Sequence, residues 1–180
     1  MVREISSGGV VLREISGTWH VALIEPQKET TATAKTPRKR VKAMLALPKG
    51  LVDPGETAPV TALREVQEET GVVAELIAKL ADIKYVYVRT WRDGERVFKI
   101  VSFYLLQYRS GEIDDVTPEM RIEVKRALWV PLAGASTQLM YSNERKVLRL
   151  AEDYLAAHGL QPENAVPSRR KAADSSHTEQ

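Results

Sequence analysis

The sequence predicts an α/β domain in which a mixed β-sheet is packed between helices. Two observations support this prediction. Strand-like runs of apolar residues recur along the chain, and two segments with a 3.6-residue apolar period lie among and after them. The chain has 180 residues, which is about one domain's length and enough for a sizeable core. We therefore expect a single domain over residues 1–160.

Five strands are expected from runs of β-branched and aromatic residues that end at turn residues. Arg92-Asp93-Gly94 suits a hairpin turn between the third and the fourth. The expected strands cover residues 3–15, 19–25, 84–91, 97–108 and 126–130.

The first helix is expected over residues 57–70. Pro59 lies in its first turn, where proline is tolerated, and Gly71 follows its last residue. Its apolar stripe comprises Val60, Leu63 and Val66.

The second helix is expected over residues 142–157, and Gly159 can terminate it. Its apolar period is set by Val147, Leu148, Ala151, Tyr154 and Leu155. We expect the two helices to pack on the two faces of the sheet that the strands form.

Three carboxylates crowd one face of the first helix. Glu65, Glu68 and Glu69 stand at positions i, i+3 and i+4, where like charges repel one another. Arg64 can neutralise only part of this charge. Hard divalent cations with oxygen ligands are natural partners, and Mg²⁺ usually binds through a few carboxylates together with substrate phosphates. The pattern favours a catalytic Mg²⁺ or Mn²⁺ site, although a solvated, salt-bridged helix would show a similar run of charges.

A loop over residues 50–56 precedes this helix. Its Pro54-Gly55 pair is typical of a turn. Gly50 has no side chain, so its carbonyl could approach a metal ion, and Glu56 could fold back onto Arg64 to fix the loop against the helix.

The stretch GLVDPGETAPVTALREVQEETGV at residues 50–72 resembles the box of the Nudix hydrolases, G-x5-E-x7-R-E-U-x-E-E-x-G-U, where U is aliphatic. Val66 and Val72 occupy the aliphatic positions. Family-like features extend on both sides, in SSGGVVLR at residues 6–13, LPKG at 47–50 and the strand at 124–130. The resemblance covers roughly residues 3–157.

This resemblance implies an α/β/α sandwich and hydrolysis of a nucleoside diphosphate linked to another group. It implies that Glu68 and Glu69 bind the metal together with the Gly50 carbonyl. Glu65 either binds a metal or accepts the proton of the attacking water. Arg64 completes the catalytic set.

Family members commonly recruit a further acidic residue from a later loop. Glu123, six residues before Trp129, matches the diadenosine polyphosphate branch, and Glu119 is the competing candidate. Glu123 is thus a candidate metal ligand and an alternative general base to Glu65, although without the family it would be an ordinary surface carboxylate.

Two lysines and a tyrosine are candidate substrate contacts. Lys49 lies beside the metal loop, and Lys99 interrupts an apolar strand, so each is predicted to contact substrate phosphate. For Lys99 a side chain reaching solvent at the strand edge is the alternative. Tyr87 lies near the position where a tyrosine accompanies diadenosine polyphosphate cleavage, although strand aromatics often only pack.

Diadenosine tetraphosphate is therefore the first substrate predicted. The alternatives are a MutT-like enzyme that sanitises nucleoside triphosphates, a diphosphoinositol polyphosphate hydrolase and an enzyme acting on capped RNA. A nucleotide sensor or an RNA-binding module without turnover is the non-enzyme alternative. His20, His158 and His177 lack the spacing of metal ligands, and no GxxxxGK[ST] loop is present.

Composition places further limits on the function. The net charge of +2 is too small to require nucleic acid as a partner. The chain has no cysteine, no long apolar run and no secretory leader, so we expect a cytoplasmic protein without membrane attachment. Residues 26–42 are expected to form a mobile basic loop, and residues 161–180 a disordered tail.

Overall fold

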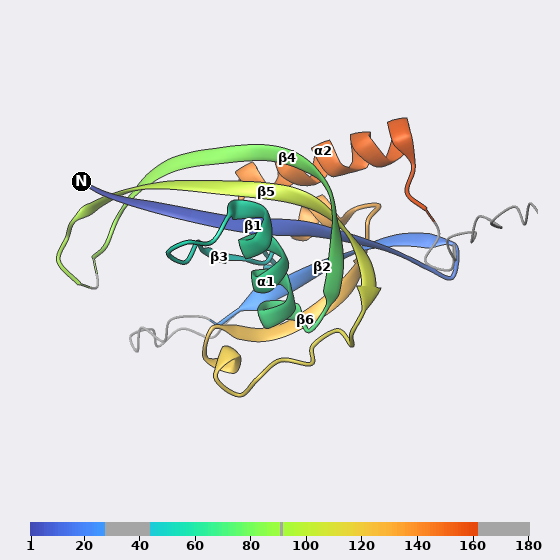
Figure 1. The fold of residues 1–180 in the computed structure, drawn as a ribbon, viewed down its shortest axis with the longest axis horizontal. Coiled ribbons are helices and arrows are strands. Elements are labelled where there is room, and N and C mark those ends of the chain that lie inside the picture. The colour runs from blue at the N-terminus through green and yellow to red at the C-terminus, as the bar shows by residue number, and fades with distance from the viewer. Residues whose placement is uncertain (28–43, 91, 162–180) are drawn as a thin grey trace, which may run out of the picture.

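The structure is a computed structural model that describes residues 1–27, 44–90 and 92–161 (Figure 1). Six strands form one sheet in the order β4-β5-β1-β2-β6, and β3 pairs with β1 outside this row. β1 and β5 run parallel, whereas the other neighbours are antiparallel, so the sheet is mixed. The strands are β1 (Val2–Ile15), β2 (Thr18–Pro26), β3 (Lys49–Leu51), β4 (Val73–Val88), β5 (Arg96–Ser110) and β6 (Val124–Pro131).

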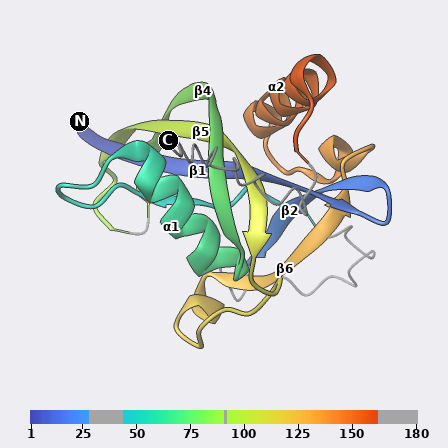
Figure 2. The same cartoon turned by 45° about the vertical axis from the view of Figure 1, so that its right-hand side comes forward.

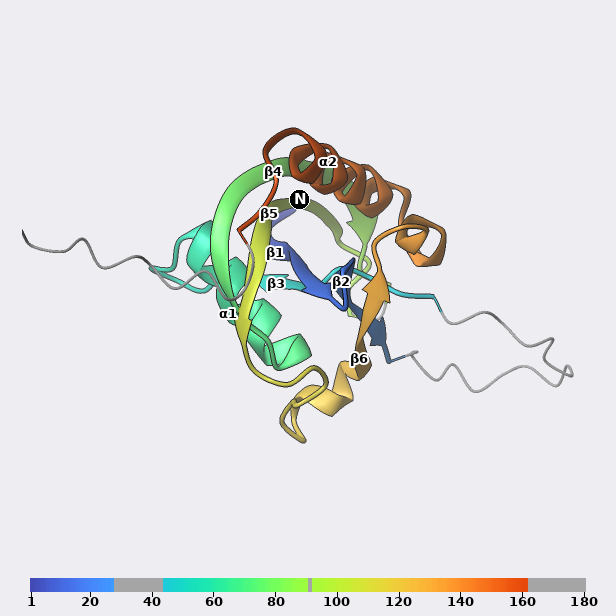
Figure 3. The ribbon, with the colours of Figure 1, turned by 90° about the vertical axis from the view of Figure 1, so that its right-hand side faces the viewer.

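Two α-helices cover opposite faces of this sheet (Figures 2 and 3). They are α1 (Ala58–Thr70) and α2 (Ser142–His158), and two short 3₁₀ helices, η1 (Met120–Ile122) and η2 (Ala135–Gln138), flank β6. The α/β/α sandwich predicted from the sequence is confirmed.

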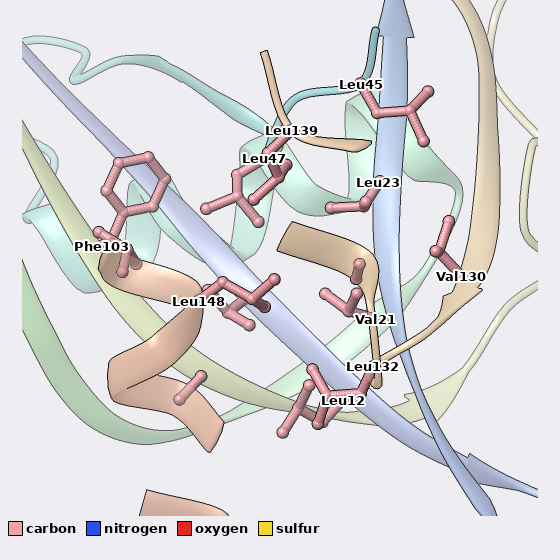
Figure 4. Close-up of a cluster of buried hydrophobic side chains, with 14 of the residues drawn as sticks. Leu12, Val21, Leu23, Leu45, Leu47, Phe103, Val130, Leu132, Leu139 and Leu148 are labelled. Carbon is pink, nitrogen blue, oxygen red and sulfur yellow. The ribbon is translucent and has the colours of Figure 1, made fainter. Parts of the chain in front are cut away.

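The pleat of the strands divides the core into two parts, because successive side chains of a strand point to opposite faces. In β5, Phe103 and Leu105 belong to the cluster packed under α2, whereas Tyr104 and Leu106 belong to the cluster under α1. Figure 4 shows the larger cluster, in which Leu148 of α2 faces side chains from the strands. Each helix is therefore anchored by its own apolar side chains, although Val60, which was predicted to belong to the α1 stripe, is half exposed.

The expected strand at residues 84–91 is too short at its N-terminal end, because β4 begins at Val73. The segment VAELIAKLADI at residues 73–83 is rich in helix formers. Register shifts between Leu76 and Ala78 and between Lys79 and Ala81 also interrupt the period of two. Neither local signal therefore indicated a strand. Pairing along β5 determines the conformation of this segment.

The predicted basic loop and tail fall almost wholly outside the described residues. Pro26 is the last residue of β2, and the amide of Gln27 donates to the carbonyl of Glu123 at 2.8 Å, so these two predicted loop residues are ordered parts of the sheet edge. None of the helices in the described ranges is long and apolar enough to cross a membrane.

Candidate active site

Helix α1 carries the predicted carboxylates, and its ends follow from local sequence. Pro59 occupies the first turn, and Gly71 ends the helix with a φ of 81°, its amide donating to the carbonyl of Gln67 at 2.9 Å. Within this helix, Glu65 and Glu69 are buried, whereas Glu68 is exposed.

The short strand β3 lies between the carboxylates of α1 and a cavity on the other face of the sheet. It pairs with β1 so that Lys49 lies opposite Gly8 and Gly50 opposite Ser7. Alternation along β3 turns the side chain of Lys49 toward the cavity and the Cα of Gly50 toward Glu65. A Cβ at Gly50 would lie 2.1 Å from both Cδ and Oε1 of Glu65, so only glycine fits here.

Glu69 is the most deeply buried of the α1 carboxylates, with 6% of its surface exposed. Burial raises the pKa of its carboxyl to about 8, although the backbone amide of Lys49 donates to Glu69 Oε2 at 3.0 Å and favours the charged form. The pKa of Glu65 is also raised, mainly by burial, with Arg64 opposing the change. The charges of Glu65 and Glu123 contribute to the raised pKa of Glu69.

This burial predicts that the metal-free protein loses stability as the pH rises. The Glu69 pKa is about 8 in the folded state and 4.5 in its reference state, so its stabilising contribution is complete below pH 4.5 and is lost as the pH rises through 8. At ~1.4 kcal/mol per unit, the loss is a few kcal/mol. The measurement is the free energy of unfolding in urea with EDTA, from pH 5 to pH 8.5.

The matched variant is Glu69→Gln, which cannot ionise at this position. The difference between wild type and variant isolates the contribution of Glu69 from those of other groups. The variant should gain stability relative to wild type across this window. An identical pH dependence in the two proteins would contradict the assignment.

Arg64 ties the loop to the helix, and its predicted contact with Glu56 is confirmed. Its Nε donates to Glu56 Oε2 at 2.9 Å and its Nη2 to Glu56 Oε1 at 2.8 Å. These bonds lower the pKa of Glu56 to about 2. Nη1 donates to Glu65 Oε1 at 2.8 Å and to Glu68 Oε2 at 3.1 Å, and Nη2 also donates to the carbonyl of Leu51 at 3.0 Å.

The loop that carries Glu123 is fixed near the C-terminal end of α1. The amide of Asp114 donates to the carbonyl of Thr70 at 2.8 Å, and Arg121 Nη1 donates to Asp114 Oδ1 at 2.7 Å. Glu123 is exposed, and its charge acts on both Glu65 and Glu69, raising their pKa values. The largest contributions to these shifts include Glu123 and do not include Glu119. Proximity therefore favours Glu123 over Glu119 as the recruited carboxylate.

In the part of the chain that the structure describes, no three acidic or histidine side chains form a ready metal cage. The oxygen donors are nevertheless grouped. Glu65 and Glu68 share one guanidinium, Gly50 lies against Glu65, and burial raises the pKa of Glu69. An oxygen-only, predominantly acidic donor set of this kind fits Mg²⁺ or Mn²⁺.

A cavity of about 470 Å³ lies on the other side of β3, between the sheet and the start of α2. Lys49 and Lys99 both line it, and Tyr141 at the N-terminus of α2 forms part of its wall. The remaining lining residues are Ile83, Tyr85, Val101, Phe103, Ser142, Asn143 and Glu144. Apolar and aromatic walls with a few polar groups are typical of a site for a small organic ligand.

Both cavity lysines are paired with carboxylates. Lys49 Nζ donates to Glu144 Oε1 at 3.1 Å. Burial is the largest influence on the Lys49 pKa and would lower it, but the charge and hydrogen bond of Glu144, together with the charges of Glu69 and Tyr85, outweigh burial and raise it. Lys99 Nζ lies 3.8 Å from Glu4 Oε2, and burial lowers its pKa despite this pairing. Their positive charge is thus partly neutralised within the protein, which leaves less of it for a phosphate than the sequence suggested.

Tyr85 and Tyr87 share one face of β4, but only Tyr85 is among the residues that line the cavity. The hydroxyl of Tyr87 donates to Glu4 Oε2 at 2.9 Å, farther along the strand. Sequence reasoning did not identify Tyr141 or Glu144 as site residues. The sequence around these two residues shows no motif that would mark them as site residues. Glu144 in particular resembles the acidic residues common in the first turn of a helix.

Comparison with known proteins places the chain among its relatives. The model of the NUDIX domain matches residues 13–151. A Mycobacterium tuberculosis protein named as mutator protein MutT4 is 34% identical over 154 residues, which are 86% of this chain and 56% of that protein. The 8-oxo-(d)GTP phosphatase of Mycolicibacterium smegmatis is 38% identical over 104 residues, 58% of this chain and 29% of that protein. The chain thus spans about half or less of these two relatives.

The asymmetrical bis(5'-nucleosyl)-tetraphosphatase of Rattus norvegicus is 30% identical over 116 residues, 61% of this chain and 71% of that protein. Among solved structures, the binary complex of a C. elegans Ap4A hydrolase aligns with a TM-score of 0.59 at 22% identity, covering 86% of this chain and 98% of that one. At this identity the likeness shows the fold alone.

Proposed function

Because the chain belongs to the Nudix family, we propose that it hydrolyses a pyrophosphate bond of a nucleoside polyphosphate with Mg²⁺ or Mn²⁺ as cofactor. The observation that carries this proposal is the carboxylate patch of α1. Glu65 and Glu69 are buried and Glu68 is exposed. Glu65 lies against Gly50, Glu69 accepts from the Lys49 amide, and Arg64 bridges Glu65 and Glu68. These oxygen donors carry a net negative charge and are separated from the cavity by β3. Such a patch suits a divalent cation that also binds the phosphates of a polyphosphate substrate.

In this proposal the Gly50 carbonyl, Glu68 and Glu69 hold the cation. When bound, the ion would neutralise negative charge on the phosphate oxygens and lower the pKa of a water molecule. Arg64 keeps Glu65 Oε1 occupied, which leaves Oε2 as the proposed acceptor of the proton from the attacking water. The raised pKa of Glu65 makes it a stronger base than an exposed glutamate. Glu123 is the alternative base and a further ligand.

The cavity is proposed to hold the nucleoside. Tyr85 and Tyr141 line it and offer aromatic faces for a base, while Lys49 and Lys99 are placed for polar contacts with the substrate. The partner is therefore a small molecule, and neither a nucleic acid nor a membrane is required.

For the substrate, the names of the more identical relatives favour a MutT-like activity on an oxidised purine nucleoside triphosphate, such as 8-oxo-dGTP. This reverses the order of preference reached from the sequence. Diadenosine tetraphosphate is the second candidate, supported by the rat tetraphosphatase, of which the chain covers the larger share.

A hydrolysis screen in Mg²⁺ tests this order. The panel comprises 8-oxo-dGTP, dGTP, diadenosine tetraphosphate, ADP-ribose and a diphosphoinositol polyphosphate, and ion-exchange chromatography identifies the products. We expect the highest kcat/KM for 8-oxo-dGTP, cleaved with one water to the monophosphate and pyrophosphate. A higher value for diadenosine tetraphosphate, cleaved to AMP and ATP, would favour the second candidate. If no compound is cleaved, the enzymatic proposal fails.

A further inference from the structure

Helix α2 carries a buried carboxylate that the proposed mechanism does not use. Glu144, in the first turn of the helix, is 3% exposed. Its Oε2 accepts from the amide of Leu47 at 3.1 Å, and its Oε1 accepts from Lys49 Nζ at 3.1 Å. Both donors belong to residues 47–50, nearly a hundred residues away in the chain. A buried carboxylate is retained only with such partners, and both of its oxygens have one.

An acid at this position often bonds back to the start of its own helix. At α2, the N-cap residue Tyr141 makes no side-chain cap hydrogen bond, and both Glu144 oxygens accept from residues outside the helix. Glu144 instead bonds to the strand that borders the metal site. Its side chain therefore connects α2 to β3 and not to the helix end.

The same segment is held from the other side by the carboxylates of α1. The amide of Lys49 donates to Glu69 Oε2 at 3.0 Å, and Gly50 lies against the carboxylate of Glu65. The chain at residues 47–50 thus lies between one carboxylate from α2 and two from α1. A shift of this segment would move the Lys49 amide away from Glu69 and the Gly50 carbonyl away from its proposed ligand position.

We propose that Glu144 is a positioning residue, which fixes residues 47–50 so that the Lys49 amide faces Glu69 and Gly50 lies against Glu65, at the proposed metal site of α1. The metal part of this inference rests on the proposed function, whereas the positioning itself does not. Glu144 also borders the cavity, so it links the cavity wall to the carboxylate patch through one hydrogen-bonded segment.

The variant that tests this role is Glu144→Gln, which keeps the volume of the side chain. A carboxylate offers two acceptor oxygens, whereas an amide offers one oxygen and an NH₂ group. The variant therefore cannot accept from both Leu47 and Lys49. The control is Asp153→Asn, an exposed acid-to-amide change on the same helix.

The first measurement is amide hydrogen exchange by NMR in the metal-free protein. Exchange of the Lys49 amide should be about 10-fold faster in Glu144→Gln and unchanged in Asp153→Asn, because local opening governs exchange. A Lys49 amide that exchanges at the wild-type rate in folded Glu144→Gln would overturn the positioning role. Should Glu144→Gln fail to fold, Glu144→Asp decides: it keeps the charge but is too short to reach both donors, and it should show the same acceleration.

The second measurement is Mn²⁺ binding by electron paramagnetic resonance of the free ion. Loss of an outer partner of a metal ligand typically weakens affinity by 10- to 100-fold, so we expect about 10-fold weaker binding in Glu144→Gln. With substrate, kcat should fall while KM changes little. Wild-type affinity for Mn²⁺ in the variant would contradict the coupling to the metal site. A wild type that cleaves no pyrophosphate would overturn the proposed function and leave the exchange result standing.

Discussion

Replacing Glu69 with Gln is expected to lower kcat by about 10²- to 10³-fold while the protein keeps its fold. The substitution preserves the volume of the side chain and an oxygen that can accept from the Lys49 amide. It removes the negative charge, which lies where burial already disfavours charge and where a cation would stabilise it. The loss should therefore fall on metal binding and turnover and not on folding.

The measurement is steady-state kinetics on the best substrate of the screen, together with circular dichroism and Mn²⁺ binding. Gln67→Ala is the matched control, because Gln67 is exposed on the same helix. It should retain wild-type kcat. A Glu69→Gln protein with more than half of the wild-type activity would remove Glu69 from the metal site.

Gly50→Ala is the second substitution with a large expected effect. Its Cβ would lie 2.1 Å from Cδ of Glu65, a separation that no pair of non-bonded carbon atoms tolerates. Either β3 or the Glu65 carboxylate must move, which displaces both the proposed carbonyl ligand and the proposed base. Misplacement of a reacting group by about 1 Å can cost 10²-fold in rate, so a loss of that order in kcat is expected.

Leu51→Ala provides the control, because it lies next to Gly50 in β3 with its side chain half exposed. The carbonyl of Leu51, which accepts from Arg64, remains in this variant. Wild-type activity is expected for Leu51→Ala. Equal losses in the two variants would indicate that β3 tolerates no change at all, and would remove the specific argument for Gly50.

The sequence predicted the carboxylate patch well because its determinants are local. Helical periodicity alone places Glu65 and Glu69 one turn apart. Glu56 and Arg64 are only eight residues apart, so the end of the loop and the first part of α1 suffice to bring them into contact. The glycine at position 50 was predicted for its carbonyl. The steric reason for it, the Glu65 carboxylate against its Cα, required the three-dimensional structure.

The sequence suggested Lys49 and Lys99 as substrate contacts but not the cavity that they line, because the cavity is assembled from distant segments. Lys99 and Glu4 lie on neighbouring strands β5 and β1, and Lys49 meets Glu144 only because α2 packs across the sheet. Pairing of this kind has no signature in a local pattern. The N-terminal half of β4 was missed for a related reason, since its partner strand and its bulges, and not its composition, set its conformation.

The measurement that tests the central claim most directly is the rate of pyrophosphate-bond cleavage as a function of free Mg²⁺, with the Glu69→Gln protein prepared in parallel. The account predicts no cleavage in EDTA, saturable activation by Mg²⁺ in the wild type, and weak activation in the variant. Cleavage that persists in EDTA, or equal activation of the two proteins, would contradict a metal-dependent site on α1.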